Sequence, residues 1–398
     1  MIPSTGFAQA ISETPRSTLP RDVQLDTLLP LLSQSIAQGI IEGVRELKGG
    51  GMDTVRRQLL EGLLGAFSTT LIRPADLLLD VANLSLAPEP WDRLLQATTH
   101  PSALNKATLD HFEQLLAKSW ALCDENELEI AERILASFLP KVGALSSEHE
   151  EAAYLASHGL RLQSIFAHHR LHRPQKIFLC EQALIYARYA GDTNTIVLAL
   201  LELAAAYGYR GKPAKRLMLL QEALHNAAQA TPIIQARAYS NTAAACAESG
   251  RLTEACQYID VAFELFPDDP TVDPAYPLAD SSIFTLSYHA GKVSTYAGNY
   301  VEAFAAFNRY QHHSAETTIP ERLRLEIVNG QSRAAIREQD AEKYAHFLAD
   351  ALASSLALGS KKRFDEAHKI FRQDVPAAWR SNSHIASIAE TYSLEEKG

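Results

Sequence analysis

Two histidines of the segment HHRLH, His168 and His172, are spaced so that they could bind a metal ion. They stand four residues apart, which puts both imidazoles on one face of a helix, a spacing that can bind zinc. No Cys, Asp or Glu stands beside them to complete a site. Arg170, Arg173 and the end of the helical pattern favour a polar cap, in which the imidazoles meet helix-terminal carbonyl groups. We therefore expect no bound metal and no cofactor.

Sequence motifs of common catalytic sites are absent from the chain. It contains no HExxH, no GxSxG and no paired catalytic carboxylates. The segment 208–212, GYRGK, resembles part of a phosphate-binding loop, but Pro213 stands where GxxxxGK[ST] requires a hydroxyl residue. Because helical repeats mostly offer binding surfaces, we expect a protein that is not an enzyme.

Composition limits the partners and the compartment. Lys and Arg number 37 against 47 Asp and Glu, a net charge of -10, so no global field attracts nucleic acid or an anionic membrane. A hydrophobic content of 46% excludes a mostly disordered chain. The four cysteines form no CxxC pair, which argues against disulfides and structural zinc and fits a reducing cytoplasm.

The first hundred residues predict a flexible arm, 1–20, followed by a helical segment, 21–100, with a linker at Gly49–Gly51. The apolar run Leu59–Ile72 contains Glu61 and is shorter than the roughly 20 residues that span a membrane. It is therefore interpreted as a buried helix rather than an anchor, and we expect no membrane association.

From residue 101 onward, helical segments alternate with short polar turns. The most regular unit is 235–270, in which Gly250 turns the chain between two helices and Pro267 ends the second. Ala243 and Ala255 are small, as required where two helix axes cross at about 8–10 Å. The pattern predicts about six helix pairs.

These units resemble the tetratricopeptide repeat, a helix pair of about 34 residues. The resemblance covers residue 101 to about residue 375 and implies an all-α, right-handed helical solenoid as the domain 101–392, preceded by the extra N-terminal helical segment. The turns carry glycine at corresponding positions, at Gly211, Gly250 and Gly298. Breaks at 268–281 and 313–321 are long enough to kink the solenoid or to carry a functional loop.

Four segments, 154–172, 262–274, 318–335 and 358–371, resemble the C-terminal sensor region of a family of bacterial transcriptional regulators. This resemblance implies a regulatory role. Those proteins usually carry a helix-turn-helix domain before the repeats, but none is readable in the first hundred residues. Basic clusters such as Lys361-Lys362-Arg363 are too small for the six to ten or so phosphate contacts of specific binders, so we predict no specific DNA binding.

Candidate groove residues follow from the phase of the repeats, because the first helix of each pair lines the concave face of such arrays. They are Tyr209; Arg237, Asn241 and Glu248; Tyr288, Lys292 and Tyr296; and Asn329, Arg333 and Arg337. This basic and aromatic set would select a compact anionic partner, such as a peptide carboxylate, an acidic segment or a phosphorylated ligand. Alternatively, Arg333 and Arg337 pair with carboxylates of residues 338–342 on the outside, and the tyrosines belong to the core.

We therefore predict a non-enzymatic, cytoplasmic module that binds a peptide or protein partner in a concave groove and serves bacterial signalling or transcriptional regulation. The alternative is a structural scaffold or adaptor that forms a homodimer. Its contacts would come from the amphipathic face Leu32–Leu47 and the apolar helix Leu59–Ile72.

Overall fold

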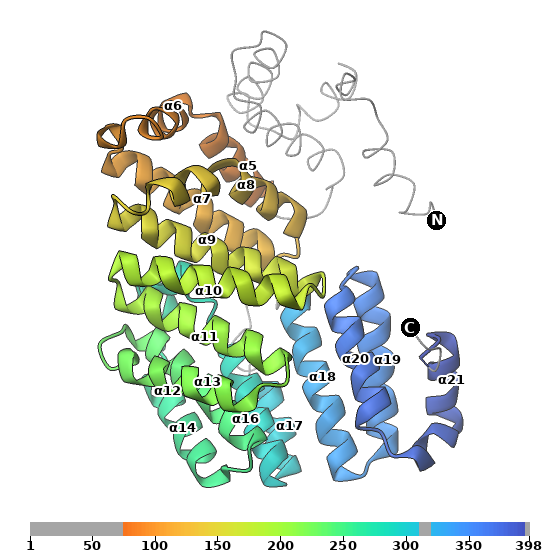
Figure 1. Ribbon diagram of the computed structural model, residues 1–398. Coiled ribbons are helices and arrows are strands. Elements are labelled where there is room, and N and C mark those ends of the chain that lie inside the picture. Colours follow the sequence, from red (N-terminus) through yellow and green to blue (C-terminus); the bar gives the residue numbers. More distant parts are fainter. Residues whose placement is uncertain (1–74, 310–319, 395–398) are drawn as a thin grey trace, which may run out of the picture. The chain divides into compact units, whose positions relative to one another are not determined.

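The computed structural model describes residues 75–309 and 320–394 (Figure 1). The chain divides into two compact units, Met1–Pro88 and Glu89–Gly398, and the described part of the first contains the helix α5 (Ala75–Leu86). The predicted arm, the glycine linker and the two helices assigned to a homodimer contact all lie outside the described residues. The boundary predicted near residue 101 stays a prediction.

The second unit is an array of antiparallel helix pairs that follows α6 (Pro88–Ala97) and the short η2 (Pro101–Ala103). The pairs are α7 (Lys106–Asp124) with α8 (Leu128–Leu145), α9 (Glu150–His169) with α10 (Arg173–Ala190), α11 (Thr193–Tyr209) with α12 (Pro213–Ala227), α13 (Pro232–Glu248) with α14 (Leu252–Leu265), α16 (Ile283–Ala297) with α17 (Tyr300–Asn308), and α18 (Glu321–Glu338) with α19 (Ala341–Ala357). The elements α20 (Lys361–Gln373), η5 (Ala377–Ser381) and α21 (Ser383–Thr391) follow.

Helix is the only regular secondary structure in the described ranges, and the predicted all-α array of helix pairs is confirmed. Within those ranges, none of the helices combines the length and the apolar character that crossing a bilayer requires.

Local sequence determines where the helices start and turn. The side chains of Asp192 and Asp340 accept hydrogen bonds from backbone N–H groups in the first turns of α11 and α19, as N-caps do. The predicted turn glycines Gly211, Gly250 and Gly298 have φ of 65°, 78° and 81°, a left-handed conformation that glycine adopts without a Cβ penalty. The repeated turns therefore have a common backbone cause.

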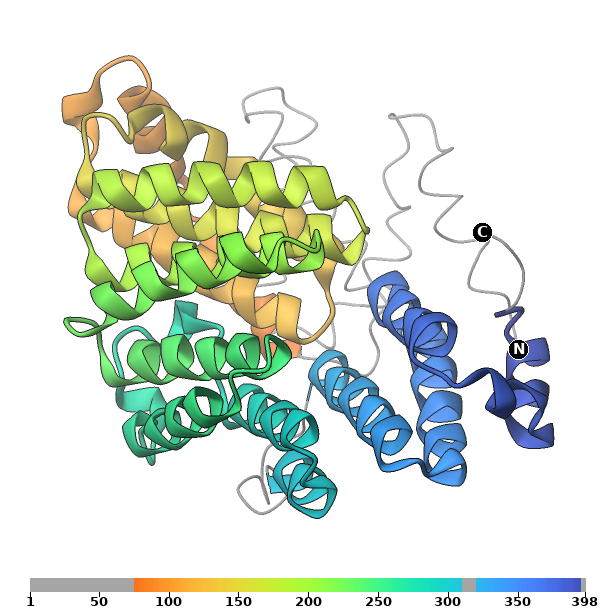
Figure 2. The same ribbon diagram turned by 60° about the horizontal axis from the view of Figure 1, so that its bottom comes forward.

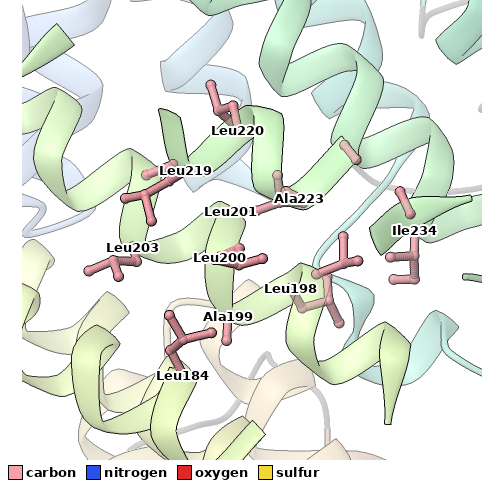
Figure 3. Packing of buried hydrophobic residues seen from close by; sticks show 14 of the residues in the cluster. Leu184, Leu198, Ala199, Leu200, Leu201, Leu203, Leu219, Leu220, Ala223 and Ile234 are labelled. Atoms are coloured by element: carbon pink, nitrogen blue, oxygen red, sulfur yellow. The ribbon is translucent and has the colours of Figure 1, made fainter. Parts of the chain in front are cut away.

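The core of the array is a layer of leucine and alanine side chains around α11 (Figure 3). α11 is apolar on nearly all sides because it packs against α9, α10, α12 and α13. Leu200 and Ala204 of α11 and Ala223 of α12 are almost fully buried, as are Ala243 and Ala255 of the next pair. The small residues allow the close helix approach that the sequence predicted.

The first helices of the pairs form a continuous inner layer, because α7, α9, α11, α13, α16 and α18 each contact the next one. The end of the array also contacts its beginning. Arg322 Nη2 of α18 lies 2.5 Å from Asp124 Oδ1 of α7, and Asn126 Nδ2 donates to the Leu358 carbonyl at 3.1 Å. Both views show α18 and α20 near the ends of α9 and α10 (Figures 1 and 2).

The break at 268–281 forms a structured insert that contains η3 (Pro270–Val272) and α15 (Tyr276–Ala279). α15 contacts α7 and α13, so the insert lies against the inner layer of helices. Arg161 Nη1 of α9 donates to the Leu278 carbonyl at 3.2 Å, and Arg237 Nη1 of α13 donates to the Ala279 carbonyl. The insert thus covers part of the face that the sequence assigned to a ligand.

Candidate functional site

A pocket of about 470 Å³ lies between α13, α16 and α18 and the segment after α20. It is lined by Glu248, Tyr288, Lys292, Thr295, Tyr296, Gly330, Arg333, Ile336, Arg337 and Asp374. Six of these are among the groove residues predicted from the phase of the repeats: Glu248, Tyr288, Lys292, Tyr296, Arg333 and Arg337. The volume is within the range of about 300–1,000 Å³ that is usual for ligand pockets.

Glu248 holds two cations at one wall of the pocket. Its carboxylate accepts from Arg216 Nη1 at 2.5 Å and from Lys292 Nζ. Burial by itself would raise the pKa of Glu248, but Lys292 and Arg216 outweigh it and lower this pKa to about 2. Glu248 is therefore ionised at neutral pH, and its charge is balanced by these two partners.

Arg337 places a positive charge at the pocket that is not neutralised by an ion pair with a described carboxylate. Its guanidinium carbon lies 4.2 Å from the centroid of the Tyr296 ring, and among the described residues no carboxylate oxygen lies within 4.0 Å of it. Its neighbour Arg333 donates to Asp374 Oδ2 at 3.2 Å. The carboxylates of Glu338 and Asp340, which the alternative assigned to these arginines, pair with Lys343 instead.

Tyr288 and Tyr296 both line the pocket and belong to the core, the two alternatives that the sequence left open for them. Each is partly buried, packs against a hydrophobic cluster and still lines the pocket. Burial and the Glu326 carboxylate raise the pKa of Tyr288, and burial and Glu248 raise that of Tyr296. Both side chains therefore stay neutral phenols, which can donate or accept a hydrogen bond and offer a ring face.

Four lining residues were missed by the sequence reasoning. Thr295 follows Lys292 by three residues and Ile336 follows Arg333 by three, so helical periodicity could have found both. Gly330 has the same spacing, three residues before Arg333, whereas Asp374 carries no such signal. Asp374 comes from the segment after α20, which reaches the pocket only through the tertiary fold.

Arg237 and Asn329 are buried, with 6% and 4% of their surface exposed, so the expectation that they line an open groove is wrong. Arg237 is covered by the insert and also donates to Asp280 Oδ2 at 3.0 Å. Asn329 lies beneath α20, with its Nδ2 3.4 Å from the Arg363 carbonyl. Asn241 is half-buried and donates to the carbonyl of Arg237 at 2.9 Å.

We expect Arg237→Ala to loosen the insert, because it removes the bonds to the Ala279 carbonyl and to Asp280. Hydrogen bonds to charged groups contribute about 1.5–3 kcal/mol, so amide exchange across 270–281 is expected to accelerate by roughly 10-fold or more. Hydrogen–deuterium exchange with mass spectrometry measures this. Arg188→Ala, which removes an exposed pair with Glu222, is the control. Unchanged exchange in the Arg237 variant would contradict the role of Arg237.

Tyr209, the remaining predicted residue, lies away from the pocket lining and is 41% exposed. Its ring centroid is 4.0 Å from that of His168, at an interplanar angle of 34°. The predicted polar cap at His168 is thus not formed, because among the described residues neither ring nitrogen has a hydrogen-bond partner. Nor do the described ranges contain a group of three His, Cys, Asp or Glu that could hold a metal ion.

Neither a protein-family model nor a curated protein matches the sequence. Among solved structures, the chain is similar to the crystal structure of the apo form of RapI, with a TM-score of 0.37 and 13% identity. The match covers 86% of this chain and 100% of that one. The pocket is therefore interpreted from its own geometry.

Proposed function

We propose that this chain is a non-enzymatic helical-repeat module of the cytoplasm, which binds a peptide or protein partner at the pocket between α13, α16 and α18. Its role would be in bacterial signalling or transcriptional regulation. The observation that carries the proposal is the position of Arg337. Its exposed guanidinium lies over Tyr296 at the rim of a pocket of about 470 Å³, with no carboxylate of the described residues within 4.0 Å.

An acidic segment fits the chemistry of this pocket. A carboxylate of the ligand could accept two parallel hydrogen bonds from the planar guanidinium of Arg337. Arg333 is nearby, but Asp374 already neutralises part of its charge. The ring faces of Tyr288 and Tyr296, together with Ile336, provide apolar contact for the remainder of the ligand. The pocket therefore favours a short peptide that combines an acidic group with an apolar side chain.

The ionisation of the pocket supports binding rather than catalysis. Glu248 has a pKa of about 2, which is far from that of a general acid or base at neutral pH. Tyr288 and Tyr296 have raised pKa values and stay protonated. Glu248 and the two tyrosines thus keep one charge state around neutral pH, which suits recognition.

We expect Arg337→Gln to weaken the binding of short acidic peptides by about 10-fold or more. The physical reason is the loss of charge-assisted hydrogen bonds, which contribute about 1.5–3 kcal/mol. Isothermal titration of the full chain with a library of such peptides measures the effect. Arg188→Gln on the outer helix α10 is the matched control and should bind like the unmodified protein.

A double variant tests the aromatic wall of the pocket. Tyr288→Ala combined with Lys292→Ala removes one ring and the cation whose Nζ lies 5.4 Å from that ring centroid. If this double variant and Arg337→Gln both bind the peptides as tightly as the unmodified chain, the assignment of the pocket is disproved. If no acidic peptide binds the unmodified chain, the proposed class of partner is wrong.

A further inference from the structure

Two basic motifs that the pocket does not use meet in the fold. His168-His169 ends α9 and Lys361-Lys362-Arg363 begins α20, and these two helices are in contact. Tyr209, at the end of α11, lies next to both motifs. Its ring centroid is 4.0 Å from that of His168 and 5.8 Å from Lys362 Nζ. Segments from three separate parts of the chain thus gather basic groups around one tyrosine.

Three of these basic side chains are buried without adequate partners. His168, His169 and Lys362 are only 6%, 5% and 6% exposed. Among the described residues, both ring nitrogens of His168 and the Nε2 of His169 have no hydrogen-bond partner. Lys362 Nζ has a carboxylate oxygen of Glu366 at 4.0 Å, beyond hydrogen-bond distance. Buried polar groups are almost always satisfied, so this concentration requires a physical reason.

Carboxylates near the cluster are already engaged by other cations. Glu202 is bound by Lys176, and Asp124 by Arg322 at 2.5 Å. Arg363 Nη1 lies 2.7 Å from Glu366 Oε2, so Lys362 shares the Glu366 carboxylate with Arg363. Arg363 also binds the carboxylate of Glu326. Among the described residues, no carboxylate oxygen therefore lies within hydrogen-bond distance of Lys362 Nζ, and an added negative charge would complement this cluster.

We propose that His168, His169 and Lys362, beside Tyr209, form a binding site for a compact oxyanion, either a phosphate or a carboxylate group. The two imidazoles and the ammonium would donate hydrogen bonds to its oxygens. Lys362 stands in the first turn of the 13-residue helix α20, whose dipole favours a negative charge near that end. Tyr209, whose ring lies against His168, is 41% exposed and forms the part of this cluster nearest to solvent. This site is independent of the pocket between α13, α16 and α18.

Binding of an anion would change the ionisation of this cluster. Burial and the neighbouring Lys362 and Lys176 hold the pKa of His168 far below its usual value. Burial and Arg363 lower the pKa of Lys362 to about 8. A bound anion would oppose both effects, because a negative charge favours the protonated form of each group.

Thermal unfolding of the full chain, with and without inorganic phosphate at constant ionic strength, tests the site. Saturating phosphate is expected to raise Tm by about 2 °C or more. Lys362→Met should abolish this rise, whereas Lys361→Met, which removes the exposed neighbouring lysine, should retain it. Sodium acetate in a parallel series distinguishes a carboxylate from a phosphate as the preferred group.

Lys362→Met is expected to fold, because it removes a buried ammonium that lacks a close partner. Circular dichroism without added anion checks this, and His169→Asn provides a second variant that should also lose the rise. The proposal is overturned if neither anion raises Tm of the unmodified chain. It is equally overturned if Lys362→Met responds as strongly as Lys361→Met.

Discussion

Replacing Glu202 by Gln is expected to lower the free energy of unfolding by about 3–5 kcal/mol, since it leaves a buried ammonium without its counter-charge. Lys176 and Glu202 bind each other with side chains only 2% and 8% exposed, and Arg237 Nη2 lies 3.8 Å from Glu202 Oε2. Urea unfolding at neutral pH measures the loss. Glu222→Gln, at the exposed pair with Arg188, should change the free energy by no more than about 0.5 kcal/mol.

The same pair predicts how stability depends on pH. Burial alone would raise the pKa of Glu202, but Lys176 and Arg237 outweigh it and lower the pKa from 4.5 to about 2. A carboxyl group whose pKa falls on folding stabilises the folded state above its unfolded pKa. This contribution is therefore complete above pH 4.5 and is lost as the pH falls towards 2. The effect of Glu202→Gln should shrink over this interval.

A double variant shows whether the loss of stability comes from breaking the ion pair or from leaving the Lys176 ammonium buried without a counter-charge. Lys176→Met combined with Glu202→Leu removes both charges and should recover most of the stability that Glu202→Gln loses. If Glu202→Gln costs less than about 1 kcal/mol at neutral pH, the ammonium of Lys176 is not held as the structure indicates.

Phe307→Ala is expected to destabilise the protein by about 3–5 kcal/mol and also to weaken peptide binding at the pocket. Phe307 is fully buried, and its ring occupies the space beside Gly291 and Gly330. A Cβ added at these glycines would lie 2.4 Å and 2.7 Å from ring atoms, so the fit of α16, α17 and α18 depends on this ring. Its removal leaves a cavity behind Gly330, which lines the pocket.

Denaturant unfolding and peptide titration of the same variant measure both effects. Phe178→Ala is the control, because Phe178 is 59% exposed on α10 and its loss should have little effect on either quantity. A stable Phe307 variant with unchanged peptide binding would show that the ring does not support the pocket.

Local sequence predicted the helix pairs because its signals act within a few residues. Gly250 ends a helix through its own left-handed backbone, and Ala243 and Ala255 mark a contact between adjacent helices of one pair. The phase of the repeat also places Tyr288 and Arg337 on the sides of α16 and α18 that line the pocket. Both positions follow from helical periodicity, which is a property of neighbouring residues.

Tertiary structure decided which parts of the inner layer stay open. The insert covers Arg237 and α20 covers Asn329, although the pattern around each residue is that of an inner face. The return of the array also brings His168 to Lys362 and Asp374 to the pocket. These contacts join segments far apart in the chain, and they depend on rotations accumulated over successive pairs. These accumulated rotations cannot be read from the periodicity of neighbouring residues. The sequence by itself therefore determined the repeating unit, and only the tertiary structure determined where the sites lie.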